Sequence, residues 1–247
     1  RIANVSIGSS KPTTFSTTLD KYTQIDHFFL PKDVSLVTFN ETLAKLKDYH
    51  LIIADIQDMS RFAAKNFGLT ENSVSFLKQL NKQNQTILTV LGSPYSLKYF
   101  QDFNTVLVGY NEEEEAESIA AQIIFGARGA EGTMPVTVGK FQYGDGECTQ
   151  SNMRLKYGNP MEVNMNIKTL QKADAIIYKA MEDKVFPGAQ LLVVKDGNVV
   201  YEKAYGFHTY DNTIATKTTD LFDIASLTKV TATMPMIMKM QEQGKIN

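Results

Sequence analysis

Over its first 141 residues the chain alternates short apolar runs with amphipathic stretches, and this alternation constrains its fold more than any other feature. The apolar runs are rich in β-branched residues, which is typical of strands buried on both faces of a sheet. They occupy residues 2–7, 34–39, 51–56, 86–91 and 106–110. Alternating strands and helices predict an α/β fold for residues 1–141, with a mostly parallel sheet sandwiched by helices.

The stretches between these runs place apolar residues at helical spacing. The most regular of them predicts a helix over residues 112–125, with Asn111 as its N-cap. Four glutamates open this helix at residues 112–115. We interpret them as complementing the helix dipole rather than as a metal site. A final strand is predicted at residues 134–138.

Parallel sheets usually bind ligands beyond the carboxyl ends of their strands. The loops there, at residues 8–11 and 92–95, contain glycine but neither G-x-G-x-x-G nor G-x-x-x-x-G-K followed by Ser or Thr. Their glycines are interpreted as turn residues, so a nucleotide-binding domain would rest on analogy of fold alone. Asp55 and Asp58 lie in the loop of residues 55–61, but two acids in a loop are common and are a weak indication of a site.

Composition excludes several kinds of partner. A net charge of −2 gives no reason to expect nucleic acid or an anionic membrane, and no apolar run approaches the roughly 18–20 residues that span a bilayer. The single cysteine, Cys148, cannot form an internal disulfide and lies in a polar stretch without a nearby histidine, so we interpret it as an inert thiol. No cofactor and no metal is predicted.

A different pattern begins after residues 142–160, whose glycines and asparagines predict a linker. Residues 161–247 are expected to form a partial α+β domain. A helix is predicted over residues 170–181. It is followed by a hairpin over residues 189–205, whose connection is a strong turn signal, Asp196-Gly197-Asn198.

A long helix is predicted over residues 226–243, ended by Gly244, although Pro235 fits poorly in its interior. Its start carries Ser226 and Lys229, which a spacing of three places on one face. A neutral lysine can take the proton of a serine hydroxyl, and a helix N-terminus offers N–H groups to a developing oxyanion. The pair therefore has the parts for acyl transfer through an acyl-enzyme.

The Ser-x-x-Lys spacing is weak by itself, because it arises about once by chance in a chain of this length. Ser75 and Lys78 have the same spacing inside an ordinary amphipathic helix, where we interpret them as surface residues. Ser226 differs in its context, since it opens a helix and follows both a hairpin and the apolar run at residues 221–225.

This context resembles the start of serine β-lactamase-like proteins, the group of class C β-lactamases, DD-peptidases and esterases. Residues 185–189, 193–205 and 222–229 carry the resemblance. It implies that Ser226 is the nucleophile and that Lys229 accepts its proton. The family's Tyr-x-Asn and Lys- or His-x-Gly elements would lie beyond the last residue, so little or no esterase or β-lactamase activity is expected of this chain alone.

Residues 1–141 resemble the C-terminal α/β sandwich domain of family 3 glycoside hydrolases, in particular the β-N-acetylglucosaminidase and β-glucosidase branch. Residues 90–95, 106–110 and 121–136 carry this resemblance. In that family the catalytic aspartate lies on a preceding (β/α)8 barrel. We therefore nominate no glycosidase carboxylates here.

Together the two resemblances predict a piece of a bifunctional hydrolase that acts on a glycan or cell-wall-derived substrate and is exported. The absence of an initial Met and a last residue just after a helix favour the same interpretation. An alternative is a non-catalytic, carbohydrate-contacting module with a degenerate second domain. The hairpin over residues 189–205 is also expected to expose a sheet edge and to promote self-association.

Overall fold

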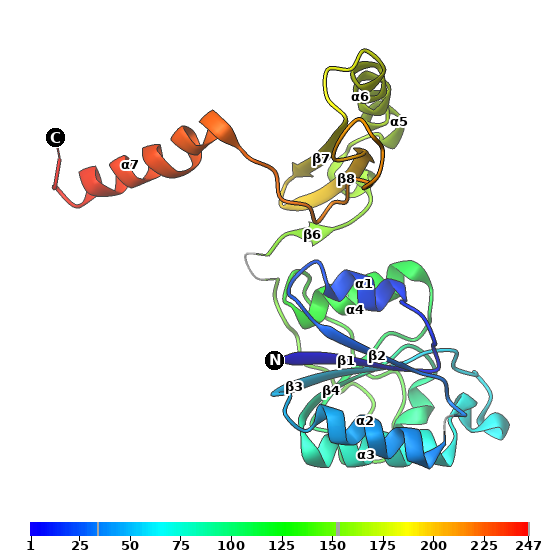
Figure 1. Cartoon of the computed structure of the whole chain (residues 1–247). Helices are drawn as coiled ribbons and strands as arrows, with labels where there is room; N and C mark the ends of the chain where they lie inside the picture. Colours follow the sequence, from blue (N-terminus) through cyan, green and yellow to red (C-terminus); the bar gives the residue numbers. More distant parts are fainter. Residues whose placement is uncertain (34, 152–153, 247) are drawn as a thin grey trace. The chain divides into compact units, whose positions relative to one another are not determined.

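Five parallel strands form the sheet in the first part of the chain, in the order β2-β1-β3-β4-β5 (Figure 1). The strands are β1 (Ile2–Ile7), β2 (Asp26–Leu30), β3 (Leu51–Ile56), β4 (Gln85–Val90) and β5 (Thr105–Val108). The computed structural model describes residues 1–33, 35–151 and 154–246. The chain divides into two compact units, Arg1–Gly158 and Asn159–Asn247.

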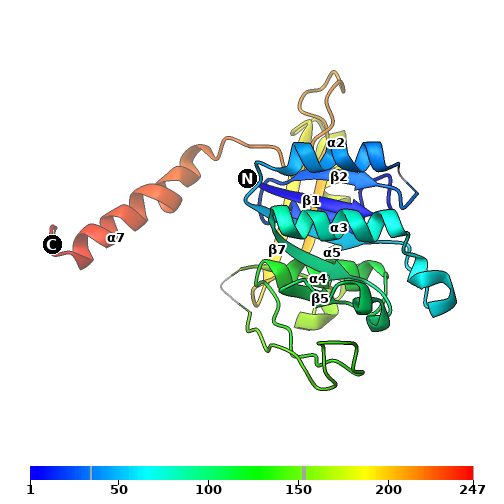
Figure 2. The ribbon, with the colours of Figure 1, turned by 90° about the horizontal axis from the view of Figure 1, so that it is seen from below.

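Helices cover both faces of this sheet, which confirms the predicted α/β fold. On one face lie α1 (Thr14–Leu19) and α4 (Glu114–Ile124). On the other face α2 (Leu36–Leu46) and α3 (Glu71–Gln83) lie side by side (Figure 2). The first unit also contains the short elements η1 (Ala63–Gly68), η2 (Pro94–Tyr99) and β6 (Lys156–Tyr157).

Strand alternation assigns side chains to the two faces. Ala3, Val5 and Ile7 of β1 are fully buried in the core under α2 and α3, where Phe39 stacks on Phe76 with 4.7 Å between ring centroids. The opposite face of the same strands, under α1 and α4, is more polar. It buries Asn4, Ser6, Asp55 and Thr89 completely.

Two predicted strands are wrong. One was predicted at residues 34–39, where residues 36–39 instead form the first turn of α2. The Ser35 hydroxyl caps that helix by accepting the Thr38 N–H at 3.2 Å. Val34 lies outside the described residues. Strand β2, which pairs with β1, was not predicted. Residues 134–138 bury Met134 and Val138, but form only an isolated bridge between Val138 and Phe141.

The helix predicted at residues 112–125 begins later than expected. Glu113 is its N-cap, and the Asn111 side chain instead accepts the Glu113 N–H at 3.1 Å. Asn111 is therefore not the cap. The Glu112 carboxylate turns back to accept the backbone N–H groups of Asp58, at 2.8 Å, and of Met59, so it ties this helix start to the loop after β3.

The second unit begins with short helices and then forms a hairpin. Its elements are η3 (Pro160–Val163), α5 (Ile167–Leu170), α6 (Lys172–Glu182), β7 (Gly188–Lys195) and β8 (Asn198–Gly206). Asp196 and Gly197 have φ angles of 51° and 73°, the left-handed pair that a tight two-residue hairpin turn requires. The predicted hairpin is confirmed.

Strand β7 exposes part of its apolar surface. Leu192 and Val194 are 56% and 42% exposed, and the strand lies at the edge of its sheet. An exposed apolar edge favours pairing with another chain, and self-association through the hairpin stays a prediction. Within the described residues, no helix has both the length and the apolar character that crossing a membrane requires.

One carboxylate fastens α6 to β8. Asp174 accepts hydrogen bonds from Lys203 at 2.5 Å, Tyr205 at 2.6 Å and Tyr201 at 2.7 Å. These three bonds lower the pKa of Asp174 to about 2, and the bond from Lys203 has the largest effect. Tyr205 is buried and packs edge-on against Tyr178 of α6, with 5.5 Å between centroids.

We predict that Asp174→Asn lowers the melting temperature of the second unit at pH 7. Because the pKa of Asp174 is lowered by folding, its stabilisation is present above pH 4 and is lost as the pH falls toward 2. Melting curves and amide exchange of α6, recorded from pH 7 to 2, should therefore show wild type and variant converging in acid.

Asp183→Asn is the matched control. Asp183 bonds Lys179 at 2.8 Å, but both side chains are more than half exposed, so this substitution should change stability little. Equal effects of the two substitutions at pH 7 would contradict the role assigned to Asp174.

Candidate functional site

The helix predicted over residues 226–243 is present, but it is irregular and contains three differently bonded segments. They are η4 (Ala225–Leu227), the π-helical η5 (Lys229–Thr233) and α7 (Met234–Glu242). Pro235 directly follows the π-helical turn, and Thr228, Thr233 and Met234 all keep right-handed helical backbone angles. The helix is therefore irregular but unbroken here, and a π-helical turn is one of the places where a helix accommodates a kink.

The end of α7 agrees with the prediction. Gly244 has a φ of 64°, and its N–H donates to Gln241 O at 2.9 Å, while the Lys245 N–H donates to Met240 O at 3.0 Å. This pair of bonds is the Schellman arrangement, which favours glycine.

The structure brings Ser226 and Lys229 together. The Lys229 Nζ donates to the Ser226 Oγ at 3.1 Å, across the junction between η4 and η5. Ser75 and Lys78 have the same spacing on α3, but the Ser75 hydroxyl is approached by Gln79 at 3.4 Å, and the structure records no bond between Ser75 and Lys78. Spacing alone therefore does not produce the contact.

A strained turn precedes Ser226. Ala225 has a φ of 43°, in the left-handed region that non-glycine residues seldom adopt. The Asp223 carboxylate accepts the Ala225 N–H at 2.8 Å and so holds this turn from its own side chain. Residues in such conformations cluster at functional sites. Asp223 was not identified from the sequence, although an Asp two residues before a helix start is a recognisable turn signal.

The pair lies on an open surface. Ser226 and Lys229 are both exposed, and among the described residues no His, Asp, Glu or Tyr side chain bonds to either of them. The N–H of Leu227 is used within the turn, since it donates to Ile224 O at 2.9 Å. Within the described residues the site therefore consists of a hydroxyl, an amine and the turn that positions them.

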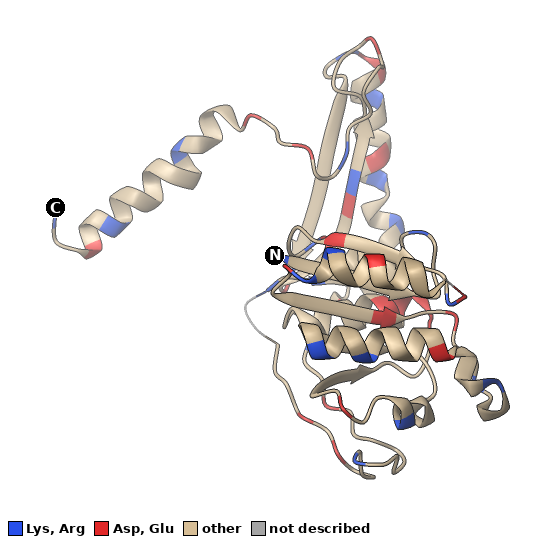
Figure 3. Ribbon diagram, turned by 60° about the horizontal axis from the view of Figure 1, so that its bottom comes forward, with Lys and Arg blue, Asp and Glu red and all other residues tan. Residues whose placement is uncertain are grey.

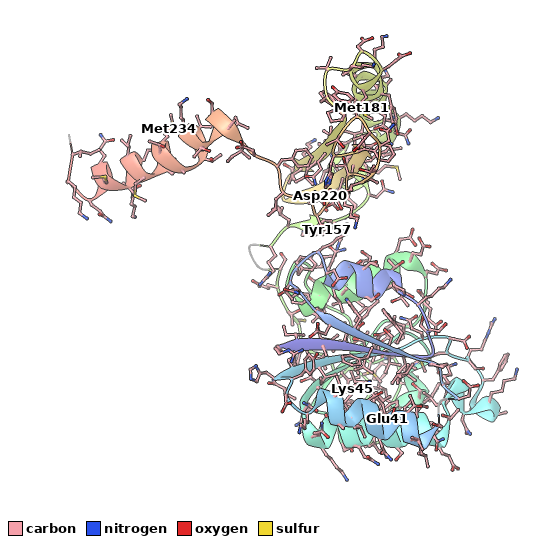
Figure 4. All side chains as sticks on the ribbon, viewed as in Figure 1. Glu41, Lys45, Tyr157, Met181, Asp220 and Met234 are labelled. Carbon is pink, nitrogen blue, oxygen red and sulfur yellow. The ribbon has the colours of Figure 1, made fainter. Side chains whose placement is uncertain are left out.

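Large apolar side chains are exposed along the segment that contains the pair. α7 itself carries two charged residues, Lys239 and Glu242 (Figure 3). Figure 4 labels Met234 at the start of α7 and shows the side chains standing out around that helix. Large apolar residues between 221 and 238 that are at least 48% exposed are Leu221, Phe222, Ile224, Leu227, Val230, Met234, Met236, Ile237 and Met238.

The acids considered in the first unit do not form a site together. Asp55 is the penultimate residue of β3, not a loop residue, and is fully buried, whereas the Asp58 side chain is 85% exposed and pairs with Lys32 at 3.1 Å. Cys148 is exposed. No group of three His, Cys, Asp or Glu residues that could hold a metal ion occurs in the described part of the chain.

The region around Ser226 is similar to known hydrolases. The model of the family described as Beta-lactamase matches residues 173–247. A putative D-alanyl-D-alanine carboxypeptidase of Escherichia coli O157:H7 is 32% identical over 100 residues, covering 38% of this chain. Protein flp of Staphylococcus aureus (strain NCTC 8325 / PS 47) is 34% identical over 77 residues, covering 31% of this chain.

The chain spans 23% of the length of the first relative and 15% of the second. A solved structure titled as a GCN5-related glucosamine N-acetyltransferase region in the fungal multi-domain GH3 β-N-acetylglucosaminidase has a TM-score of 0.45 and 16% identity, covering 60% of this chain and 16% of its own. A likeness that slight carries no argument. The family match and the relatives, in contrast, support a module related to serine hydrolases in the second unit.

We predict that Asp223→Ala loosens the turn before Ser226. Removing the acceptor of the Ala225 N–H leaves the left-handed conformation without its side-chain bond, so amide exchange across residues 225–227 should rise roughly three- to tenfold. Glu242→Ala, which removes only an exposed pair with Lys239, is the control and should leave those amides unchanged. Unchanged exchange in Asp223→Ala would show that the turn does not depend on this carboxylate.

Proposed function

We propose that the second unit is the nucleophile-bearing part of a serine hydrolase, with Ser226 as the nucleophile and Lys229 as its proton acceptor. The observation that carries the proposal is the 3.1 Å contact between the Lys229 Nζ and the Ser226 Oγ, within the segment that the family model matches. Two relatives match 38% and 31% of this chain, and the first is named a putative carboxypeptidase.

The proposed chemistry is acyl transfer. A neutral Lys229 accepts the hydroxyl proton as the Ser226 Oγ attacks a carbonyl carbon, and the amine or alcohol leaving group then departs with that proton. Water hydrolyses the resulting ester and regenerates the serine. By the name of the first relative, the substrate class is an acyl peptide of the D-alanyl-D-alanine kind, and a β-lactam would acylate the same oxygen.

Groups beyond the pair are needed for efficient turnover. An oxyanion requires preorganised donors, and loss of one such donor typically costs about 10²–10³ in rate. The described residues present the pair on an exposed surface, without a further acid or base bonded to it. We therefore expect slow acylation and little turnover from this chain by itself.

The test is covalent labelling of Ser226. A fluorophosphonate or a labelled penicillin, applied to the protein in its longest available form, should modify the peptide that contains Ser226, and Ser226→Ala should abolish the label. Lys229→Arg should slow labelling by about 10²-fold or more, because a guanidinium cannot accept the proton.

Ser75→Ala is the matched control, since Ser75 precedes Lys78 at the same spacing. It should label at the wild-type rate. Labelling that survives Ser226→Ala would refute the assignment, and its complete absence in the longest form would favour the alternative of a degenerate, non-catalytic module.

For the first unit we propose an accessory role in a family 3 glycosidase. The support is the resemblance of residues 90–95, 106–110 and 121–136, together with the parallel sheet of the first unit. Tyr95 follows β4 at the carboxyl end of the sheet and is 52% exposed, which suits stacking on a sugar ring. A preceding barrel would supply the catalytic carboxylates.

We predict that this chain does not hydrolyse nitrophenyl β-N-acetylglucosaminide or nitrophenyl β-glucoside. The carboxylates it buries or pairs, such as Asp55 and Asp174, are already engaged by several donors within the fold. Release of nitrophenol, followed photometrically, should match the rate without protein. If the purified chain did hydrolyse these substrates, and substitution of one carboxylate abolished that hydrolysis, a glycosidase site would lie within these residues.

A further inference from the structure

A chain of hydrogen bonds links the surface of the first unit to its centre. The exposed Asp20, at the end of α1, contacts the Nε2 of His27 at 2.8 Å. The Nδ1 of His27 contacts the Asn4 Oδ1 at 2.9 Å, and the Asn4 Nδ2 donates to the Asp55 Oδ1 at 2.7 Å. All four side chains lie on or beside the sheet face under α1 and α4.

The orientation of Asn4 is fixed by its surroundings. The same Nδ2 also donates to the backbone carbonyl of Ile53 at 3.0 Å. Turning the amide over would place its oxygen against this carbonyl, which can only accept a hydrogen bond. Asn4 therefore presents its oxygen, an acceptor, to His27.

His27 consequently faces two acceptors. Its Nδ1 meets the amide oxygen of Asn4, and its Nε2 meets the carboxylate of Asp20. A neutral imidazole has one N–H and satisfies only one of them, whereas the imidazolium donates to both. The ring side chain is only 17% exposed, so water compensates poorly for a lost bond.

We propose that Asp20, His27, Asn4 and Asp55 form a proton-sensitive latch, in which the doubly protonated ring of His27 fastens the edge strand β2 to α1 and β1. Loss of one ring proton breaks one of the two bonds. The latch is therefore closed while both ring nitrogens carry protons and is weakened once one proton is lost.

Charged groups lie around the ring on several elements. Asp20 lies beside it, Asp26 is its neighbour on β2, and Asp55 lies beyond Asn4. Arg1 opposes them, but its guanidinium is paired with Asp26 at 2.9 Å. Under the helices Glu117 adds negative charge near Asp55.

Asp55 contributes its own pH dependence. Burial raises the pKa of Asp55 to about 6, against hydrogen bonds from Gln57, Ser6 and Asn4 that lower it. A carboxyl whose pKa is raised by folding stabilises the fold in acid, and this contribution is lost between about pH 4 and 6. The contribution of Asp55 must therefore be separated from that of His27 by variants.

The experiment is a comparison of wild type with His27→Gln from pH 6 to 9, using the full chain. At pH 6 the variant should melt roughly 2–6 °C lower, because it lacks a charged hydrogen-bonding group. The difference should shrink as the pH rises. Asp55 is present in both proteins, so its titration contributes to both curves.

Ring protonation can be read directly, because the chain has three histidines. Nitrogen-15 spectra, assigned with His27→Gln, His50→Gln and His208→Gln, should show both nitrogens of His27 protonated at pH 6 in the folded state. Asp20→Asn replaces an exposed side chain, so this variant should still fold. In it, the His27 ring should lose its second proton at a lower pH than in the wild type.

His50→Gln is the control for stability. The exposed Nδ1 of His50 contacts the amino terminus at 3.1 Å. Replacing His50 should therefore change the melting temperature by an amount that does not vary with the protonation of His27. A His27 ring with a single proton throughout pH 6–9 would overturn the proposal. So would a constant melting difference between wild type and His27→Gln.

Discussion

The first unit is organised by the need of a parallel sheet to bury both of its faces. α1, α2 and α3 each connect two consecutive strands and α4 follows β5, so that α1 and α4 lie on one face and α2 and α3 on the other. The two faces are not equivalent. One is filled by aliphatic and aromatic side chains, whereas the other encloses Asn4, Ser6 and Asp55, whose polar groups are satisfied by one another.

Much of this arrangement could be predicted from the sequence, because strands buried on both faces are read directly as short β-branched runs. The exceptions have physical causes. Residues 26–30 contain Asp26 and His27, so an edge strand with one polar face did not stand out. The apolar run at residues 36–39 became helical because Ser35 caps it. The polar cluster of Asn4, Ser6 and Asp55 was also missed, although their alternate positions within apolar strands are a usable signal.

The candidate site shows what a motif can and cannot predict. Two Ser-x-x-Lys sequences lie on helical elements, but only Lys229 reaches its serine. The difference comes from the turn at Ala225 and the irregular start of the helix, which depend on backbone conformation rather than on spacing. Pro235 was a misfit in a regular α-helix, and the structure places it directly after a π-helical turn.

The composition of α7 has a chemical consequence. Met234, Met236 and Met238 present thioethers that are 53%, 62% and 57% exposed. A thioether is flexible and apolar, so such a surface adapts to many packing partners. Peroxide converts it to a polar sulfoxide. The surface next to the serine and lysine pair is thus sensitive to oxidants, and a preparation stored without a reductant would gradually change the character of that helix.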